Sequence, residues 1–253
     1  MSFDGLYINA VGIKAQSLEP AQRTRYPVGL FPSLLTEHIP FRKPVTFFVG
    51  DNGSGKSTLI EAIAIIMGFN AEGGTRNFRF STRGSHSELV KHLYIDRGLK
   101  KPRDGFFLRA ESFFNVATNI EELDRERSFG GSIIDSYGGV SLHEQSHGES
   151  FLALMNNRFD GHGLYILDEP EAALSPVGQL SMLNIIHRLV ENEGSQFIIA
   201  THSPLLTKYP NADIFQFGGG EIKLTPYAET DLAVLYKDFL ANDRLLTEML
   251  KLD

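Results

Sequence analysis

The residues whose types and spacing best suit chemistry lie in one short stretch near position 50. Gly50 and the triplet Gly55-Lys56-Ser57 fit the pattern of a phosphate-binding loop between a strand and a helix. Glycines allow backbone N–H groups to approach phosphate oxygens, and the helix N-terminus adds partial positive charge. Lys56 can reach the β- and γ-phosphates, and the Ser57 hydroxyl can bind Mg²⁺. The expected nucleotide-binding residues are Asn52, Gly53, Ser54, Gly55, Lys56, Ser57 and Thr58.

Two adjacent carboxylates end a second apolar strand. The apolar run at 163–167 is followed by Asp168 and Glu169. A first carboxylate at a strand end can hold Mg²⁺ beside Ser57, and the second can activate a water molecule. The alternative is an ordinary strand end that leads into a solvated turn.

Two single polar residues follow other predicted strands. His202 lies just beyond the strand at 196–200, at the edge where open α/β sheets bind ligands, and could donate a hydrogen bond to a γ-phosphate. A structural histidine with satisfied hydrogen bonds is the alternative. Glu111 follows the strand at 105–110 and could sense the metal or the attacking water, or it could simply be an acid at a helix start.

Ser146 and Gly148 precede an apolar helix. A hydroxyl, a glycine and a helix N-terminus together can form a second anion site. The alternative is a plain helix cap, because Ser146 and Glu149 have the spacing of a capping box.

A competing motif overlaps this stretch. Residues 143–147 read His-Glu-Gln-Ser-His, which fits the H-E-x-x-H pattern of zinc proteases. That chemistry needs a continuous helix and a third ligand. Gly148 follows the motif at once, the apolar periodicity starts only at Phe151, and the downstream acids Asp168 and Glu169 already suit Mg²⁺ chemistry. Zinc is therefore the less favoured interpretation.

Predicted strands and helices alternate along the chain. Strands are expected at 6–15, 45–49, 105–110, 163–167 and 196–200, with a hairpin at 213–225. Helices are expected at 56–67, 87–95, 112–127, 149–159, from 176 to about 193, and from 229 to 250. This alternation predicts an α/β fold with a largely parallel sheet between layers of helices. We expect one domain over 1–253, with an N-terminal β element and a short helical subdomain at about 112–160.

Composition fits a soluble globular protein and excludes several classes of function. Apolar residues make up 42% of the 253 residues and charged residues 22%. The absence of cysteine excludes disulfides and thiolate metal sites and suits a reducing cytoplasm. The N-terminus lacks a signal-peptide pattern, and no apolar run approaches the ~18 residues that a membrane span requires.

Charge is distributed unevenly. The net charge of −7 argues against a protein built to coat nucleic acid. The segment from Arg76 to Arg109 nevertheless holds nine Lys or Arg and three Asp or Glu. This segment is a candidate surface for DNA or RNA, and a solvated basic face is the alternative.

In order and spacing, these motifs resemble the ABC-type ATPase superfamily between about Val45 and Pro204. Residues 50–58 resemble its Walker A motif and residues 164–169 its Walker B motif with the catalytic glutamate. Residues 146–150 lie where its signature motif lies, and residues 173–175 resemble its D-loop. Glu111 lies where its Q-loop glutamine would fall, and His202 resembles its switch histidine.

The resemblance implies Mg²⁺-dependent ATP hydrolysis by two copies that hold two ATP molecules between them. Lys56 would hold phosphates, Ser57 and Asp168 would hold Mg²⁺, and Glu169 would polarise water while His202 senses the γ-phosphate. Ser146 and Gly148 would contact the γ-phosphate bound by the other copy. The implied location is the cytoplasm.

The sequence departs from the family pattern at several positions. Gln145, His147 and Glu149 replace the expected leucine, glycine and glutamine of the signature, and Glu111 replaces a glutamine. Only the residues 112–145 separate Glu111 from Ser146, too few for a long coiled coil. The residues 168–176 together with 201–204 resemble the form seen in soluble, SMC-like ATPases more than in transporters, and the chain looks like such a head without arms.

Two questions stay open from the sequence. The ATPase could drive a soluble, nucleic-acid-linked process; it could be a regulatory or defence switch that acts on a partner protein, or a separate motor subunit of a membrane transporter. The residue that contacts the adenine could be Tyr7, Tyr26, Phe41 or Arg42.

Overall fold

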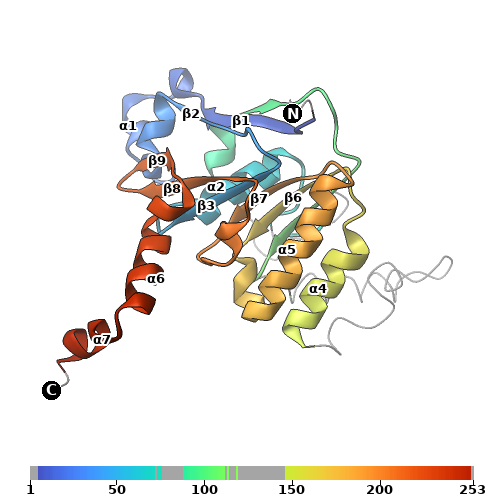
Figure 1. Ribbon diagram of the computed structural model, residues 1–253. Coiled ribbons are helices and arrows are strands. Elements are labelled where there is room, and N and C mark those ends of the chain that lie inside the picture. Colours follow the sequence, from blue (N-terminus) through green and yellow to red (C-terminus); the bar gives the residue numbers. More distant parts are fainter. Residues whose placement is uncertain are drawn as a thin grey trace.

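The computed structural model describes residues 5–71, 73–75, 88–111, 113, 118 and 146–251. Its main sheet has six strands in the order β5-β6-β7-β3-β8-β9 (Figure 1). The first five strands in this order are parallel, and β9 pairs antiparallel with β8 at the edge. The strands are β3 (Val45–Gly50), β5 (Asp104–Arg109), β6 (Gly163–Asp168), β7 (Gln196–Ala200), β8 (Ala212–Gly218) and β9 (Glu221–Leu224).

Helices cover both faces of this sheet. Helix α2 (Lys56–Ile66) packs on one face, and α4 (His147–Arg158) and α5 (Pro176–Glu191) pack on the other. Alternation along β3 explains this layering, because Phe47 belongs to the core under α4 and α5 whereas Phe48 belongs to the core under α2. The three-layer α/β fold expected from the sequence is confirmed.

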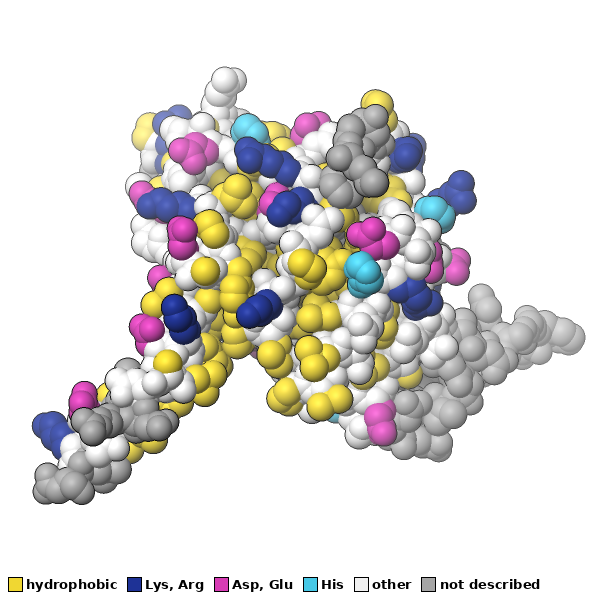
Figure 2. All heavy atoms as spheres, in the orientation of Figure 1, with side chains coloured by type: hydrophobic (Ala, Val, Ile, Leu, Met, Phe, Trp, Pro, Cys, Tyr) yellow, Lys and Arg dark blue, Asp and Glu magenta, His cyan; other side chains and the backbone are white. Residues whose placement is uncertain are grey.

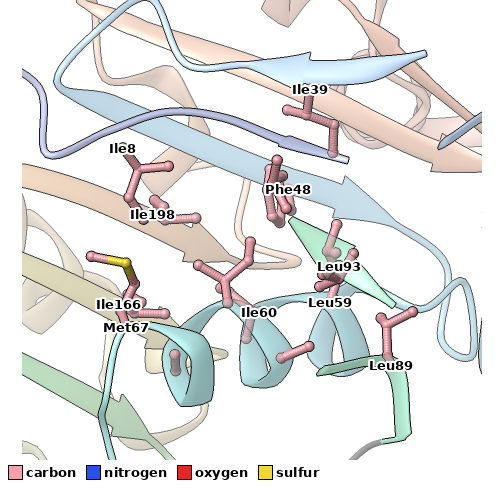
Figure 3. Packing of buried hydrophobic residues seen from close by; sticks show 14 of the residues in the cluster. Ile8, Ile39, Phe48, Leu59, Ile60, Met67, Leu89, Leu93, Ile166 and Ile198 are labelled. Carbon is pink, nitrogen blue, oxygen red and sulfur yellow. The ribbon is translucent and has the colours of Figure 1, made fainter. Parts of the chain in front are cut away.

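A second, antiparallel sheet, in the order β2-β1-β4, packs into the same core as α2. It consists of β1 (Ile8–Ile13), β2 (His38–Pro40) and β4 (Leu93–Arg97). Figure 3 shows Ile8, Ile39 and Leu93 of this sheet, Phe48 and Ile198 of the main sheet, and Leu59 and Ile60 of α2 in one shared core. The predicted N-terminal β element is thus joined to the main sheet by a continuous apolar interior.

One local prediction is wrong. The sequence suggested a helix over 87–95, but Glu88–Lys91 forms a single 3-10 turn (η4) and strand β4 follows. Leu93 and Ile95 pair with Ile13 and Val11 of β1 across the small sheet. Residues 93–97 form a strand because they pair with β1, some 80 residues away. The local pattern of apolar residues contains no information about such a distant partner.

The remaining elements are short, except at the C-terminus. They are η1 (Ala15–Ser17), α1 (Pro20–Arg23), η2 (Val28–Leu30), η3 (Pro32–Leu35), η6 (Pro170–Ala173), η7 (Leu206–Lys208) and η8 (Tyr227–Glu229). The single helix expected at 229–250 is divided at Asn242, which has an extended backbone. Helices α6 (Asp231–Ala241) and α7 (Asp243–Leu250) end the described chain and extend away from the body (Figure 1). We call these two helices the C-terminal arm.

Most of the helix expected at 112–127 lies outside the described residues. The sequence also suggests a short strand at 78–80 and a loop at 128–139, and both segments lie outside the described residues. Among the helices that are described, none combines the length and the apolarity needed to cross a bilayer.

One buried amide joins the two sheets. The side chain of Gln196, at the start of β7, accepts hydrogen bonds from the backbone N–H groups of Tyr7 and Ile8 and donates one to the Ile8 carbonyl. Gln196 is 1% exposed, so these backbone groups have little access to water. Buried backbone groups without partners are costly, which gives this residue a structural role.

We predict that Gln196→Leu lowers the free energy of unfolding by about 3 kcal/mol, because it leaves three buried backbone groups without partners. Urea unfolding followed by circular dichroism measures the loss. The exposed Gln16 provides the matched control, since Gln16→Leu should change stability by less than about 0.5 kcal/mol. Equal stabilities of the two variants would contradict this role of Gln196.

Candidate functional site

The loop between β3 and α2 can be built only with glycine at two of its positions. Gly50 has φ 140° and Gly55 has φ 98°, values that favour glycine. A Cβ on Gly50 would lie 2.3 Å from the Phe217 carbonyl oxygen, and one on Gly55 would lie 2.7 Å from the Phe31 ring. The glycines therefore let this loop fit tightly between its neighbours, while a Cβ on Gly53 would meet no atom within 4 Å.

Lys56 is buried inside this loop. Its Nζ donates hydrogen bonds of 2.8 Å to the Gly50 carbonyl and 3.0 Å to the Asp51 carbonyl. Burial lowers the pKa of Lys56, although the nearby carboxylates of Glu169 and Asp168 oppose this shift. The ammonium group is thus placed at the centre of the loop, ready to exchange carbonyl partners for phosphate oxygens.

The Asp168 carboxylate lies where β6 meets the start of α2. It is 4% exposed; its Oδ1 accepts a 3.0 Å hydrogen bond from Ser57 Oγ, and its Oδ2 accepts a 3.1 Å hydrogen bond from Arg109 Nε. Burial raises the pKa of Asp168, and the Arg109 charge and the Ser57 hydrogen bond oppose that rise. Both carboxylate oxygens therefore have fixed partners.

Arg109 and Glu61 belong to this cluster, although sequence reasoning assigned them no role. Arg109 also donates a 2.9 Å hydrogen bond from Nη1 to Glu61 Oε2 on α2. Burial alone would lower the pKa of Arg109, but the carboxylates of Asp168 and Glu61 outweigh it and raise that pKa. Two signals were present in the sequence: Glu61 is the acid in an apolar helix, and Arg109 ends an apolar strand as Asp168 ends its neighbour.

Glu169 and His202 lie next to each other at the same sheet edge. Glu169 has φ 50°, in the left-handed region that non-glycine residues seldom adopt, and its side chain is about one third exposed. The His202 Nε2 lies 3.5 Å from Glu169 Oε1 and, among the described residues, has no hydrogen-bond partner. An unpaired buried ring nitrogen beside a strained acid is typical of a site that binds a further group.

A third carboxylate fixes the turn that carries His202. Glu171 accepts a 2.7 Å hydrogen bond from the Thr201 hydroxyl and a short one from the His202 backbone N–H. The Thr201 backbone N–H in turn donates to the Phe48 carbonyl of β3. The turn that carries His202 is therefore hydrogen-bonded to β3, the strand that leads into the phosphate-binding loop.

Ser146 and Gly148 lie at the start of α4, apart from the loop. Ser146 is the N-cap of α4 and forms a capping box with Glu149, whose pKa these hydrogen bonds lower. A Cβ on Gly148 would lie 3.2 Å from the Ala173 carbonyl oxygen, so α4 packs closely on the end of η6. The cap that the sequence offered as an alternative is present, and the role of these residues as an anion site stays a prediction.

A cavity of about 230 Å³ borders the loop on its solvent side. It is lined by Tyr26, Leu30, Asn52, Gly53, Gly55, Lys56, Ser57, Thr58 and Glu169. Ser54 has a buried hydroxyl oxygen without a partner among the described residues. The open side at Gly53, this orphaned hydroxyl and the buried ammonium fit an anionic phosphate chain.

Of the four residues that the sequence offers for contact with the adenine, one lines the cavity. Tyr26 is 75% exposed and lines the cavity. Tyr7 is buried and donates a hydrogen bond to Gly194, and Phe41 is buried against Phe48. Arg42 is exposed but is not among the residues that line the cavity.

The oxygen atoms near Asp168 suit Mg²⁺. Ser57 Oγ and Asp168 Oδ1 lie 3.0 Å apart and are hard ligands. Within the described residues no group of three or more His, Cys, Asp or Glu side chains could hold a metal alone. A Mg²⁺ ion bound by one or two side chains plus phosphates needs no such group.

The zinc alternative has no support in the described structure. Residues 143–145 of the H-E-x-x-H pattern lie outside the described residues, and His147 is in the first turn of α4 rather than inside a longer helix. Glu111 is described: it is exposed in the turn after β5, two residues beyond Arg109.

Comparison with known proteins finds a family profile and relatives that are named as ATP-binding proteins. A family profile described as an AAA domain matches residues 31–133. A Geobacter sulfurreducens protein named as an ABC transporter ATP-binding protein is 25% identical over 171 residues, which cover 61% of this chain and 58% of that protein. The zinc import ATP-binding protein of Vibrio cholerae is 26% identical over 162 residues, which cover 62% of this chain and 56% of that protein.

Solved structures with a similar fold have low identity. A nucleotide-free ATP-binding cassette from an ABC transporter matches with a TM-score of 0.45 and 17% identity, over 95% of this chain and 98% of its own. The SMC head domain from Thermotoga maritima matches with a TM-score of 0.44 and 16% identity, over 87% and 99%. The chain spans little more than half the length of the first curated relatives that it matches.

We predict that Arg109→Gln lowers the free energy of unfolding by about 3 kcal/mol, because the buried Asp168 and the partly buried Glu61 lose their shared cation. Urea unfolding at pH 7 measures this loss. The exposed Arg103 supplies the control, and Arg103→Gln should cost less than about 0.5 kcal/mol. Adding Glu61→Gln to Arg109→Gln should restore part of the stability, and a further loss instead would show that the bridge is assigned wrongly.

Proposed function

We propose that this chain, which is similar to ABC-type P-loop ATPases, hydrolyses ATP at the loop between β3 and α2. The observation that carries the proposal is the convergence of different groups at one sheet edge. Lys56, Ser57 and Glu169 line one cavity, Asp168 accepts a hydrogen bond from Ser57, and the His202 ring lies beside Glu169. Phosphate binding, metal binding and water activation need these three kinds of group.

The chain's own residues would bind and orient the nucleotide. Backbone N–H groups of residues 53–58 and the Lys56 ammonium would hold the phosphates. Ser57 Oγ and Asp168 Oδ1 would hold Mg²⁺, which supplies neutralising charge to the phosphate oxygens. Arg109 would keep the Asp168 carboxylate in place through Oδ2, so that Oδ1 stays directed toward Ser57.

Glu169 is the proposed general base. Its carboxylate lines the cavity and is reached by solvent, so it can polarise a water molecule near the γ-phosphate. His202 would donate a hydrogen bond to the γ-phosphate from the ring nitrogen that has no partner in the described structure. The left-handed backbone of Glu169 directs its side chain toward this ring.

A second copy of the chain is proposed to complete the site. Ser146 and Gly148 lie at the start of α4, and the hydrogen bonds of Ser146 run to Glu149 and Ser150, not to the loop. By the family resemblance, these residues would reach the γ-phosphate held by another copy. ATP would then close a pair of chains, and hydrolysis would let the pair open.

A transport role has better support than a nucleic-acid role. The curated relatives described above carry names of transporter ATP-binding proteins, which favours a separate motor subunit for a membrane transporter. The basic segment from Arg76 to Arg109 is weakened as a nucleic-acid surface, because Arg109 is bound to Asp168 and Glu61. Lys100 and Lys101 are exposed, and Arg79 and Arg83 lie outside the described residues.

A pull-down with Glu169→Gln as bait, with and without ATP, tests what the ATPase drives. A transport role predicts a membrane partner that is captured in an ATP-dependent manner. A soluble protein partner would instead indicate the regulatory or defence switch. Recovery of nucleic acid, lost at high salt, would instead support the nucleic-acid-linked process that the sequence left open.

We predict that Glu169→Gln lowers the rate of ATP hydrolysis by at least about 100-fold while ATP stays bound, because the amide cannot accept a proton from water. Phosphate release measures the rate, and equilibrium dialysis measures binding. Lys56→Ala should lose ATP binding as well, which separates the two roles. Hydrolysis by Glu169→Gln at the wild-type rate would exclude Glu169 as the base.

We predict that Tyr26→Ala weakens ATP binding by about tenfold with little change in the turnover rate, because the exposed ring at the cavity would stack on the base. Tyr26→Phe keeps the ring and should retain wild-type affinity. Fluorescence titration with an ATP analogue checks both. Equal weakening by the two variants would exclude stacking.

A further inference from the structure

The C-terminal arm presents large apolar side chains to solvent, on most sides of α6 and on one face of α7. In α6, Val234, Leu235, Tyr236, Phe239 and Leu240 are all exposed, and in α7 so are Leu246, Met249 and Leu250. Figure 2 shows apolar side chains along the arm that continue onto the adjacent part of the body, with the molecule hollowed between the two. A helix that is apolar on most sides is normally buried, so something must cover this arm.

The exposed area matches what one partner contributes to a stable interface. The eight side chains are between 43% and 74% exposed. With ~200 Å² for each fully exposed large apolar side chain, they present roughly 900 Å². This is about the area that each partner buries in a standard interface and exceeds the ~300–600 Å² of the largest apolar patch on most monomers.

The arm starts at the same sheet edge as the nucleotide site. Asp231, its first residue, is hydrogen-bonded through its backbone N–H and its side chain to Gln216 on β8. Gln216 pairs with Val49, the residue before Gly50 of the phosphate-binding loop. A molecule that covers the nucleotide site from this edge would therefore also meet the arm.

Charge argues against a lipid or nucleic-acid occupant. Residues 231–251 contain four acidic and three basic residues, and the whole chain has a net charge of −7. Interfacial helices and nucleic-acid surfaces use an excess of Lys and Arg on their polar faces. The arm lacks this excess, which favours a protein surface as its partner.

The body has an exposed apolar patch at the same edge. Val177 and Leu180 lie in the first turns of α5, just after the segment at 173–175, and Leu205 follows His202 by three residues. A copy related by a two-fold axis would turn this patch toward the first copy, next to its nucleotide site. Two-fold symmetry makes such an interface self-complementary, because each copy offers one arm and one patch.

We infer that the C-terminal arm docks on the body patch of a second copy of this chain when ATP closes the pair. The inference rests on the proposed function and extends it. The arm–patch contact would bury apolar surface between the two copies, in addition to the contacts that they make through the nucleotide. It would also restrict pairing to chains that carry both elements.

The experiment measures ATP-dependent pairing in the Glu169→Gln background, by light scattering over a range of protein concentrations. Leu235→Glu with Leu240→Glu should raise the dissociation constant of the dimer by at least about tenfold while each chain still binds ATP. Leu99→Glu is the matched control, because Leu99 is a fully exposed leucine far along the sequence from the arm, and it should pair normally. If the arm variant paired at the same protein concentration as the Leu99→Glu control, the inference would be overturned.

A mixing experiment separates docking from a folding defect. Val177→Glu with Leu180→Glu should also prevent pairing, but a mixture of the arm variant and the patch variant should recover part of it. In the mixture the intact arm of one chain meets the intact patch of the other. A mixture that stays monomeric with ATP bound would overturn the inference and leave the ATPase proposal standing, whereas absence of ATP binding in the Glu169→Gln parent would overturn both.

Discussion

The site depends on one carboxylate that is held away from water between two partners. Asp168 would be costly to bury as an isolated anion, and Ser57 and Arg109 offset that cost from opposite sides. Arg109 carries the connection further, to Glu61 on α2. Through these contacts β5, β6 and the helix after the phosphate-binding loop are fixed relative to one another. A small change in any of them would shift the groups proposed to bind phosphate and metal.

Parallel pairing explains why residues from distant parts of the chain meet at this point. Gly50, Arg109 and Asp168 each end a strand of the same parallel sheet, so all three lie at its carboxyl edge. The alternation of apolar residues along each strand fills the two cores and leaves the strand ends for polar groups. The fold therefore positions the side chains at the strand ends, and the chemistry depends on which polar residue ends each strand.

The fold and the motif-bearing parts of the site were accessible to sequence reasoning. Apolar runs that end in Gly50, Asp168 and Thr201 are strong local signals, and the structure forms strands where they predict them. The contacts of Arg109, Glu61 and Glu171 were not accessible, because each partner lies dozens of residues away and no local spacing encodes it. Strand β4 was misassigned for the same reason. The chemical roles of Glu169, His202, Ser146 and Glu111 remain predictions.

The backbone of Glu169 has a consequence for how this site would change under selection. A glutamate with φ 50° is held in a conformation that costs roughly 1 kcal/mol and that glycine adopts freely. Replacement of this residue by glycine would therefore relieve the backbone cost, at the expense of the proposed base. A lineage that keeps glutamate here accepts a stability–activity trade-off. A relative with glycine at the same position would be expected to keep the fold and to have lost turnover.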